Sequence, residues 1–193
     1  MWSQVLTATA LPSFNRPEIG GSALDRSSLI VESEPEPRAF AHRRWPVHST
    51  SAAGEVDLTD WSLRVFGAVT DELRFTWQDM SCLPEADAFA DADLTSRRRA
   101  GRHWLGVDVS SVLALAGARG DADWLVVHSE GGYRRDLPLD RVFEGPALLA
   151  RQVDDGPLSN RDGGPLRLIL PRLDARNYAK WVRGLELRTD LPG

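Results

Sequence analysis

The residues best suited to chemistry lie in the C-terminal third of the chain. Gly163-Gly164-Pro165 has the composition of a sharp turn, and glycine at such a turn lets the backbone approach a ligand closely. Arg167, Arg172 and Lys180 follow this turn and supply positive charge. Cations gathered around one turn favour an anionic ligand. An alternative stays open, in which these side chains form ordinary surface ion pairs.

Short strands and short helices must position these residues. Thr76 is a suitable N-cap for a helix that ends near Leu83, and Asp108 for a helix that ends before Gly117. Apolar and alternating patterns predict strands at 61–67, 73–76, 124–128, 133–139, 148–153, 166–171 and 181–187. The expected fold class is α+β, with mixed, mostly antiparallel sheets and short helices.

The N-terminal region has a different composition from the rest. Residues 1–40 are rich in Pro, Gly and Ser, which disfavour regular structure. We therefore expect an extended arm over 1–40 and one domain over 41–193. Within the arm, residues 29–31 could form a short strand. The arm is either loosely attached or covers a pocket or a subunit interface.

Composition narrows the classes of function. The net charge of −5 argues against nucleic acid or an acidic membrane as the main partner, and no apolar run is long enough to span a membrane. Residues 1–14 make a poor secretory signal, so the expected location is the cytoplasm. A single cysteine, Cys82, excludes an intramolecular disulfide, and we expect it to be a small buried residue. Homo-oligomerisation stays open.

Several short motifs occur in an informative order. W-x-L-x-V-F-G at residue 61 is followed by W-x-G-V-D at residue 104, by D-W-L-V-V-H-S-x-G-G-Y at residue 123, by G-G-P-L-R at residue 163 and by K-W-V-R-G-L-E-L at residue 180. In this order and at these distances they resemble the molybdopterin-binding domain of sulfite oxidase and its small bacterial relatives, over about 43–187. The resemblance implies the sulfite-oxidase-type molybdopterin-binding fold and an oxidoreductase that uses molybdopterin with molybdenum.

The chain departs from the resembled family at three positions. In the family a cysteine thiolate binds molybdenum, but this chain has Asp93 there or, with a gap, Ser96. Asp162 stands where relatives carry a histidine that contacts the pterin, and Tyr178 stands where they carry serine or glycine. The cofactor is an anion, and a like charge at about 4 Å costs several kcal/mol in a partly buried site. Loss of the cofactor is therefore the first expectation.

Three functions remain as hypotheses. In the first, the remodelled cavity binds an organic small molecule and can transform it by acid–base chemistry through Asp93, Asp162 and Tyr178. In the second, the chain is an active molybdopterin-dependent oxidoreductase with an oxygen ligand from Asp93 or Ser96. In the third, it is a non-catalytic subunit or interaction module. The expected ligand-binding residues are Arg167, Arg172, Asn177, Lys180, Trp45 and Arg134.

Overall fold

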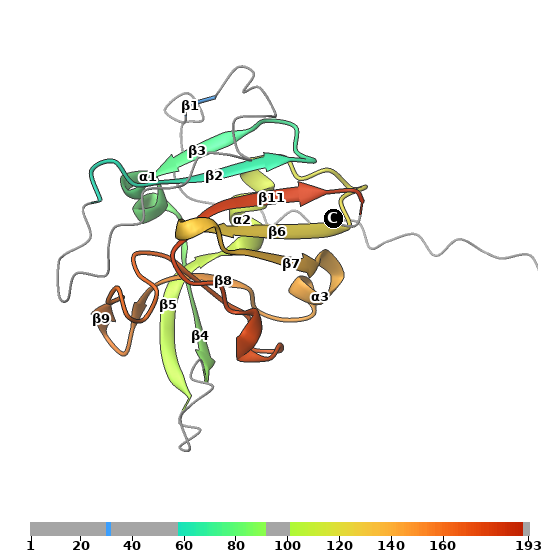
Figure 1. Ribbon diagram of the computed structural model, residues 1–193. Helices are drawn as coiled ribbons and strands as arrows, with labels where there is room; N and C mark the ends of the chain where they lie inside the picture. The colour runs from blue at the N-terminus through green and yellow to red at the C-terminus, as the bar shows by residue number, and fades with distance from the viewer. Residues whose placement is uncertain (1–29, 32–57, 92–100, 191–193) are drawn as a thin grey trace, which may run out of the picture.

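The computed structural model describes residues 30–31, 58–91 and 101–190, which form two β-sheets with short helices at their ends (Figure 1). The larger sheet has six strands in the order β1, β3, β2, β11, β6 and β7. Strands β2 and β11 pair in parallel, and the other neighbours are antiparallel. These strands are β1 (Ile30–Val31), β2 (Ser62–Gly67), β3 (Leu73–Thr76), β6 (Trp124–Ser129), β7 (Arg134–Pro138) and β11 (Val182–Arg188).

The second sheet is antiparallel and has five strands. Its order is β10, β8, β5 and β4, and the short β9 also pairs with β8. The register between β5 and β8 shifts between Leu105 and Gly106, which marks a bulge or irregularity. The strands are β4 (Glu85–Ala90), β5 (Arg102–Asp108), β8 (Leu148–Val153), β9 (Gly156–Pro157) and β10 (Arg167–Ile169).

Helices in the described part of the chain are short. They are α1 (Trp77–Cys82), α2 (Val109–Leu115) and α3 (Leu139–Phe143), with 3₁₀ turns η2 (Glu130–Gly132) and η3 (Ala175–Asn177). The predicted N-caps are confirmed, because Thr76 accepts a hydrogen bond from the Asp79 amide and Asp108 accepts one from the Ser110 amide. Across the described ranges, no helix combines the length and the apolar character that a membrane crossing requires.

Thr76→Ala should destabilise the fold by about 1 kcal/mol. The Thr76 hydroxyl accepts from the Asp79 amide at 3.2 Å, and the Asp79 carboxylate accepts from the Thr76 amide at 2.8 Å, so two amides at the start of α1 are satisfied reciprocally. Urea unfolding measures the loss. Ser81→Ala is the control, because the Ser81 hydroxyl donates to the Trp77 carbonyl within α1 and caps no helix end. Equal stability of Thr76→Ala and wild type would contradict the prediction.

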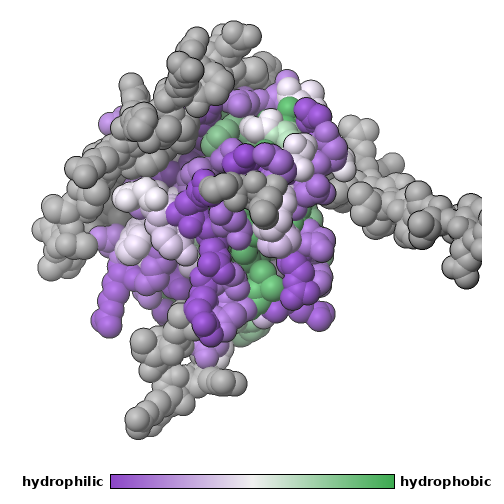
Figure 2. Space-filling view, turned by 45° about the vertical axis from the view of Figure 1, so that its right-hand side comes forward, coloured by the Kyte–Doolittle hydropathy of each residue, from purple (hydrophilic) through white to green (hydrophobic). Residues whose placement is uncertain are grey.

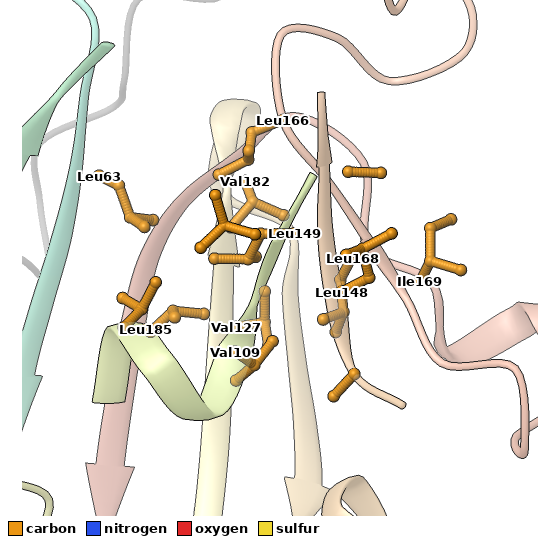
Figure 3. Packing of buried hydrophobic residues seen from close by; sticks show 14 of the residues in the cluster. Leu63, Val109, Val127, Leu148, Leu149, Leu166, Leu168, Ile169, Val182 and Leu185 are labelled. Carbon is orange, nitrogen blue, oxygen red and sulfur yellow. The ribbon is translucent and has the colours of Figure 1, made fainter. Parts of the chain in front are cut away.

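The hydrophobic core lies between the two sheets. Leu63, Val127 and Leu185 face it from the larger sheet, while Leu149 and Leu168 face it from the smaller one (Figure 3). All five are fully buried. The described surface in Figure 2 is mostly hydrophilic, with hydrophobic residues confined to a narrow band. Apolar packing thus holds the two sheets together.

The expected fold class is confirmed, with corrections of detail. The predicted strands and helices did not include β4, β5, β9 or α3, and Cys82 is exposed rather than buried. Cys82 is the last residue of the six-residue helix α1, in which Met80 alone is buried, so the thiol falls on the solvent side. Residues 30–31 do form a strand, which pairs with β3. The rest of the predicted arm over 1–40 lies outside the described residues.

Candidate functional site

The Gly-Gly-Pro turn is tightly closed. The Gly163 amide donates to the Asn160 carbonyl at 3.1 Å, and the Gly164 amide donates to the Ser159 carbonyl at 2.9 Å. Gly163 has a φ of 100°, and a Cβ there would lie 2.6 Å from Cγ of Lys180. Only glycine therefore fits at this position, because both the backbone conformation and the neighbouring side chain exclude a larger residue.

Asp162, immediately before this turn, has a fixed carboxylate. Its Oδ2 accepts from the Ser159 hydroxyl at 2.7 Å, and its backbone amide donates to that same hydroxyl at 3.1 Å. Its Oδ1 accepts from Arg102 at 3.2 Å. The carboxylate predicted as an acid–base group is thus held by the turn on one side and by a guanidinium from β5 on the other.

Two guanidinium groups lie near the ring of Trp104. Arg102 and Arg167 lie 5.5 Å and 5.2 Å from the centre of its indole ring, and the ring nitrogen donates to the Ala90 carbonyl at 3.0 Å. Arg167 is 5% exposed and donates to the backbone carbonyl of Asp162 at 2.9 Å. The Trp104 indole is thus a cation–π partner of two arginines.

Arg102 has a second acidic partner, which sequence reasoning did not identify. Its Nε donates to Asp154 at 2.6 Å, and this hydrogen bond is the largest cause of a raised pKa for Arg102. The same bond, followed by one from the His103 amide, lowers the pKa of Asp154. Arg102 therefore stays protonated and joins the Asp154 turn to the Asp162 turn.

Lys180 and Trp181 close the other side of the turn. The Lys180 ammonium donates to the Arg161 carbonyl at 2.7 Å and lies 5.7 Å from the centre of the Trp181 ring. The Trp181 amide donates to the Gly163 carbonyl, and its indole donates to Asn160. Trp181 has a φ of 53°, which is uncommon for a residue other than glycine.

Tyr178 is buried beside both signs of charge. It is 7% exposed, and burial is the main cause that raises its pKa to about 12. Arg167 acts in the opposite direction, while Asp91 and Asp174 add to the rise. The phenol is therefore neutral at physiological pH and suited to donate a hydrogen bond, while the raised pKa makes it a weak proton donor. Asp91, the residue after β4, is an acidic neighbour that sequence reasoning missed.

The two arginines after the Gly131-Gly132 turn point to different partners. Arg135 donates to the side-chain oxygen of Asn177 at 3.1 Å, and Asn177 in turn donates to the Asp174 carbonyl at 3.0 Å. Arg134, which the sequence favoured, pairs instead with Asp136 at 3.0 Å on the exposed side of β7. Alternation along the strand explains this, since neighbouring side chains point to opposite faces.

The remaining predicted residues do not all lie beside the Gly163-Gly164-Pro165 turn. Arg172 packs its stem against Gly145, where an added Cβ would lie 2.4 Å from its Cγ. Asp93, Ser96 and Trp45 lie outside the described residues. The structure thus brings Asp162, Arg167 and Lys180 to the same turn, with Tyr178 beside Arg167, and adds Arg102.

Comparison with known families agrees with this fold. The family model named the oxidoreductase molybdopterin-binding domain matches residues 49–191, about three quarters of the chain. The chain therefore belongs to this family of molybdopterin-binding oxidoreductase folds.

Among individual relatives, the uncharacterized oxidoreductase YuiH of Bacillus subtilis is 31% identical over 131 residues, covering 67% of this chain and 66% of YuiH. YedZ1 of Azospira oryzae, provisionally named a protein-methionine-sulfoxide reductase subunit, is 25% identical over 72% of this chain and 53% of its own length. The crystal structure of the sulfane dehydrogenase SoxCD from Paracoccus pantotrophus has a TM-score of 0.62 at 25% identity, covering 72% of this chain and 40% of that chain. The matched region is thus shorter than each relative.

Proposed function

We propose that this member of the family works without molybdenum and uses the site around Asp162, Arg167 and Tyr178 to bind an organic small molecule. The position of sulfur carries the proposal. The chain has one cysteine, Cys82, and it lies exposed at the end of α1, which packs on β3 of the larger sheet. The chain therefore offers no cysteine thiolate beside the Gly163 turn that could bind molybdenum.

Charge at the turn supports the same proposal. The carboxylate of Asp162 is directed at Arg102, and the cations Arg167 and Lys180 are directed at backbone carbonyls of Asp162 and Arg161. A bound anion would have to compete with these contacts, and the nearby carboxylate would repel it. These residues therefore fit a strongly anionic pterin poorly.

In the proposed function Tyr178 donates a hydrogen bond to the ligand, because its raised pKa keeps the phenol neutral. Asp162 accepts a hydrogen bond, and Arg167 and Lys180 orient a polar part of the ligand. Asp93 stays the second candidate for acid–base chemistry. Fold does not fix the reaction, so the proposal extends to a class of site and not to a substrate.

The expected result is that wild-type protein, expressed in a host that makes the molybdenum cofactor, contains far less than one equivalent of molybdenum and of pterin. Metal analysis by mass spectrometry and fluorescence of the oxidised pterin measure both. A sulfite oxidase purified from the same host is the positive control. Near-stoichiometric molybdenum with pterin would contradict the proposal.

The family match favours a second candidate, an active molybdopterin-dependent oxidoreductase with an oxygen ligand. The same measurement separates the two. If molybdenum is present, Asp93→Ala and Ser96→Ala identify the ligand. The variant that lacks the ligand should lose the metal, and the other variant should keep the metal.

A further inference from the structure

Both sequence neighbours of Tyr178 are anchored, each to a different sheet. The side-chain oxygen of Asn177 accepts a hydrogen bond from Arg135 of β7 at 3.1 Å, and β7 belongs to the larger sheet. The carbonyl of Ala179 accepts from the Leu168 amide of β10 at 2.8 Å, and β10 belongs to the smaller sheet. The short segment that carries Tyr178 is therefore held between the two sheets, with one contact on each side.

Arg135 reaches this segment because of its place on β7. Leu137, two residues further along the strand, is buried in the core, and alternation puts Arg135 on the same face of the sheet. The residue that pairs with Arg135 on β6, Val127, is buried in the core as well. The half-buried guanidinium therefore points from the larger sheet toward the loop after β10.

Asn177 extends this contact to the rest of η3. Its side-chain nitrogen donates to the Asp174 carbonyl at 3.0 Å, and its backbone amide donates to the same carbonyl at 2.8 Å. The Tyr178 amide donates to the Ala175 carbonyl at 3.1 Å. One amide side chain thus joins β7 to both ends of η3. Its donor is a charged guanidinium, and such hydrogen bonds are stronger than those between neutral groups.

We infer that Arg135 is a positioning residue for the proposed site, because through Asn177 it holds the Tyr178 phenol in its buried place beside Arg167. A ligand then meets a hydroxyl that is already ordered, which lowers the entropy cost of binding. The inference rests on the proposed function, in which Tyr178 donates a hydrogen bond to the ligand. The adjacent Arg134 lies on the opposite face of β7 and pairs with Asp136, so it does not share this role.

The pKa of Tyr178 reports whether Arg135 acts through position or through charge. Burial is the main cause that raises this pKa to about 12, and the charges that act on it are those of Arg167, Asp91 and Asp174. Removing a nearby cation raises the pKa of a phenol, because the phenolate loses an attracting charge. Exposing the phenol to water lowers its pKa instead. The direction of the change therefore separates the two roles.

Arg135→Ala should lower the pKa of Tyr178 from about 12 toward its ordinary value of 10.0. The chain has two tyrosines, so Tyr133→Phe as the common background leaves one phenol, whose ionisation is followed by ultraviolet absorbance. At pH 10 the Arg135→Ala variant should hold at least about ten times more phenolate than the background chain. Arg134→Ala is the matched control and should titrate like the background. Circular dichroism at each pH shows that the folded chain is being titrated.

Two further variants test the route through Asn177. Asn177→Ala should lower the pKa of Tyr178 as much as Arg135→Ala does, and the double variant should lower it no further, because both substitutions remove the same link. Arg135→Lys keeps a single charged donor, so its pKa should fall between those of Arg135→Ala and the background chain.

An unchanged or raised pKa in folded Arg135→Ala would overturn the inference. If Arg135→Ala does not fold, Asn177→Ala decides in the same way. Failure of both variants to fold would also overturn the inference, because the link would then serve stability and not the position of one phenol. Molybdenum near one equivalent in wild type refutes the proposed function instead, which metal analysis shows without any of these variants.

Discussion

Gly106→Ala should lower the free energy of unfolding by about 3 kcal/mol, near the upper end of the cost of overpacking. Gly106 lies at the register shift between β5 and β8, where a Cβ would be 2.1 Å from the Leu149 carbonyl oxygen and 2.7 Å from the Ala150 Cα. Both are backbone atoms, so the two strands themselves must separate. For a domain of this size the loss corresponds to roughly 6–12 °C in melting temperature.

Differential scanning calorimetry provides the measurement for Gly106→Ala. Gly120→Ala is the control, because nothing lies within 4 Å of the added methyl group. The control should melt close to wild type. Equal melting temperatures for the two variants would show that β5 and β8 can accommodate a methyl group between them, contrary to the packing described.

The second large effect concerns pH. The pKa of Tyr178 rises from its ordinary value of 10.0 to about 12 in the folded chain. Above pH 10 the unfolded chain loses this proton while the folded chain keeps it, so stability is complete below pH 10 and falls until about pH 12. Two units of pKa correspond to about 2 to 3 kcal/mol.

Tyr178→Phe removes this contribution. Between about pH 10 and 12 the variant should lose about 2 to 3 kcal/mol less stability than wild type, as measured by urea unfolding at a series of pH values. Tyr133→Phe, at the half-exposed position, is the control and should follow the wild-type curve. Parallel pH curves for wild type and Tyr178→Phe would mean that burial of the phenol does not couple to folding.

Sequence patterns predicted most of the elements because their periodicity is local. Thr76 and Asp108 start helices through contacts within three residues, and the predicted strands alternate or are continuously apolar. Strand β4 escaped detection because its inward positions are alanines, Ala88 and Ala90, whose small side chains give a weak apolar signal. Its pairing with β5 is what makes it a strand.

The site was predictable only in part, for a similar reason. The glycine turn, Arg167 and Lys180 lie close in sequence and could be recognised together. Arg102 reaches Asp162 across sixty residues, and Arg135 reaches Asn177 across forty-two, so their roles depend on strand register. The sequence does not indicate which of Arg134 and Arg135 faces inward. That depends on how β7 pairs with β6.

The central position of β11 has a consequence for biosynthesis. This strand lies between β2 and β6, so in the larger sheet it alone joins the early hairpin of β2 and β3 to the later pair of β6 and β7. During synthesis from the N-terminus, the β2–β3 hairpin and the β6–β7 pair each have an unpaired strand edge until residues 182–188 are made. Exposed edges of this kind attract other strands. Until β11 inserts, the facing edges of β2 and β6 therefore have no strand to pair with in this sheet.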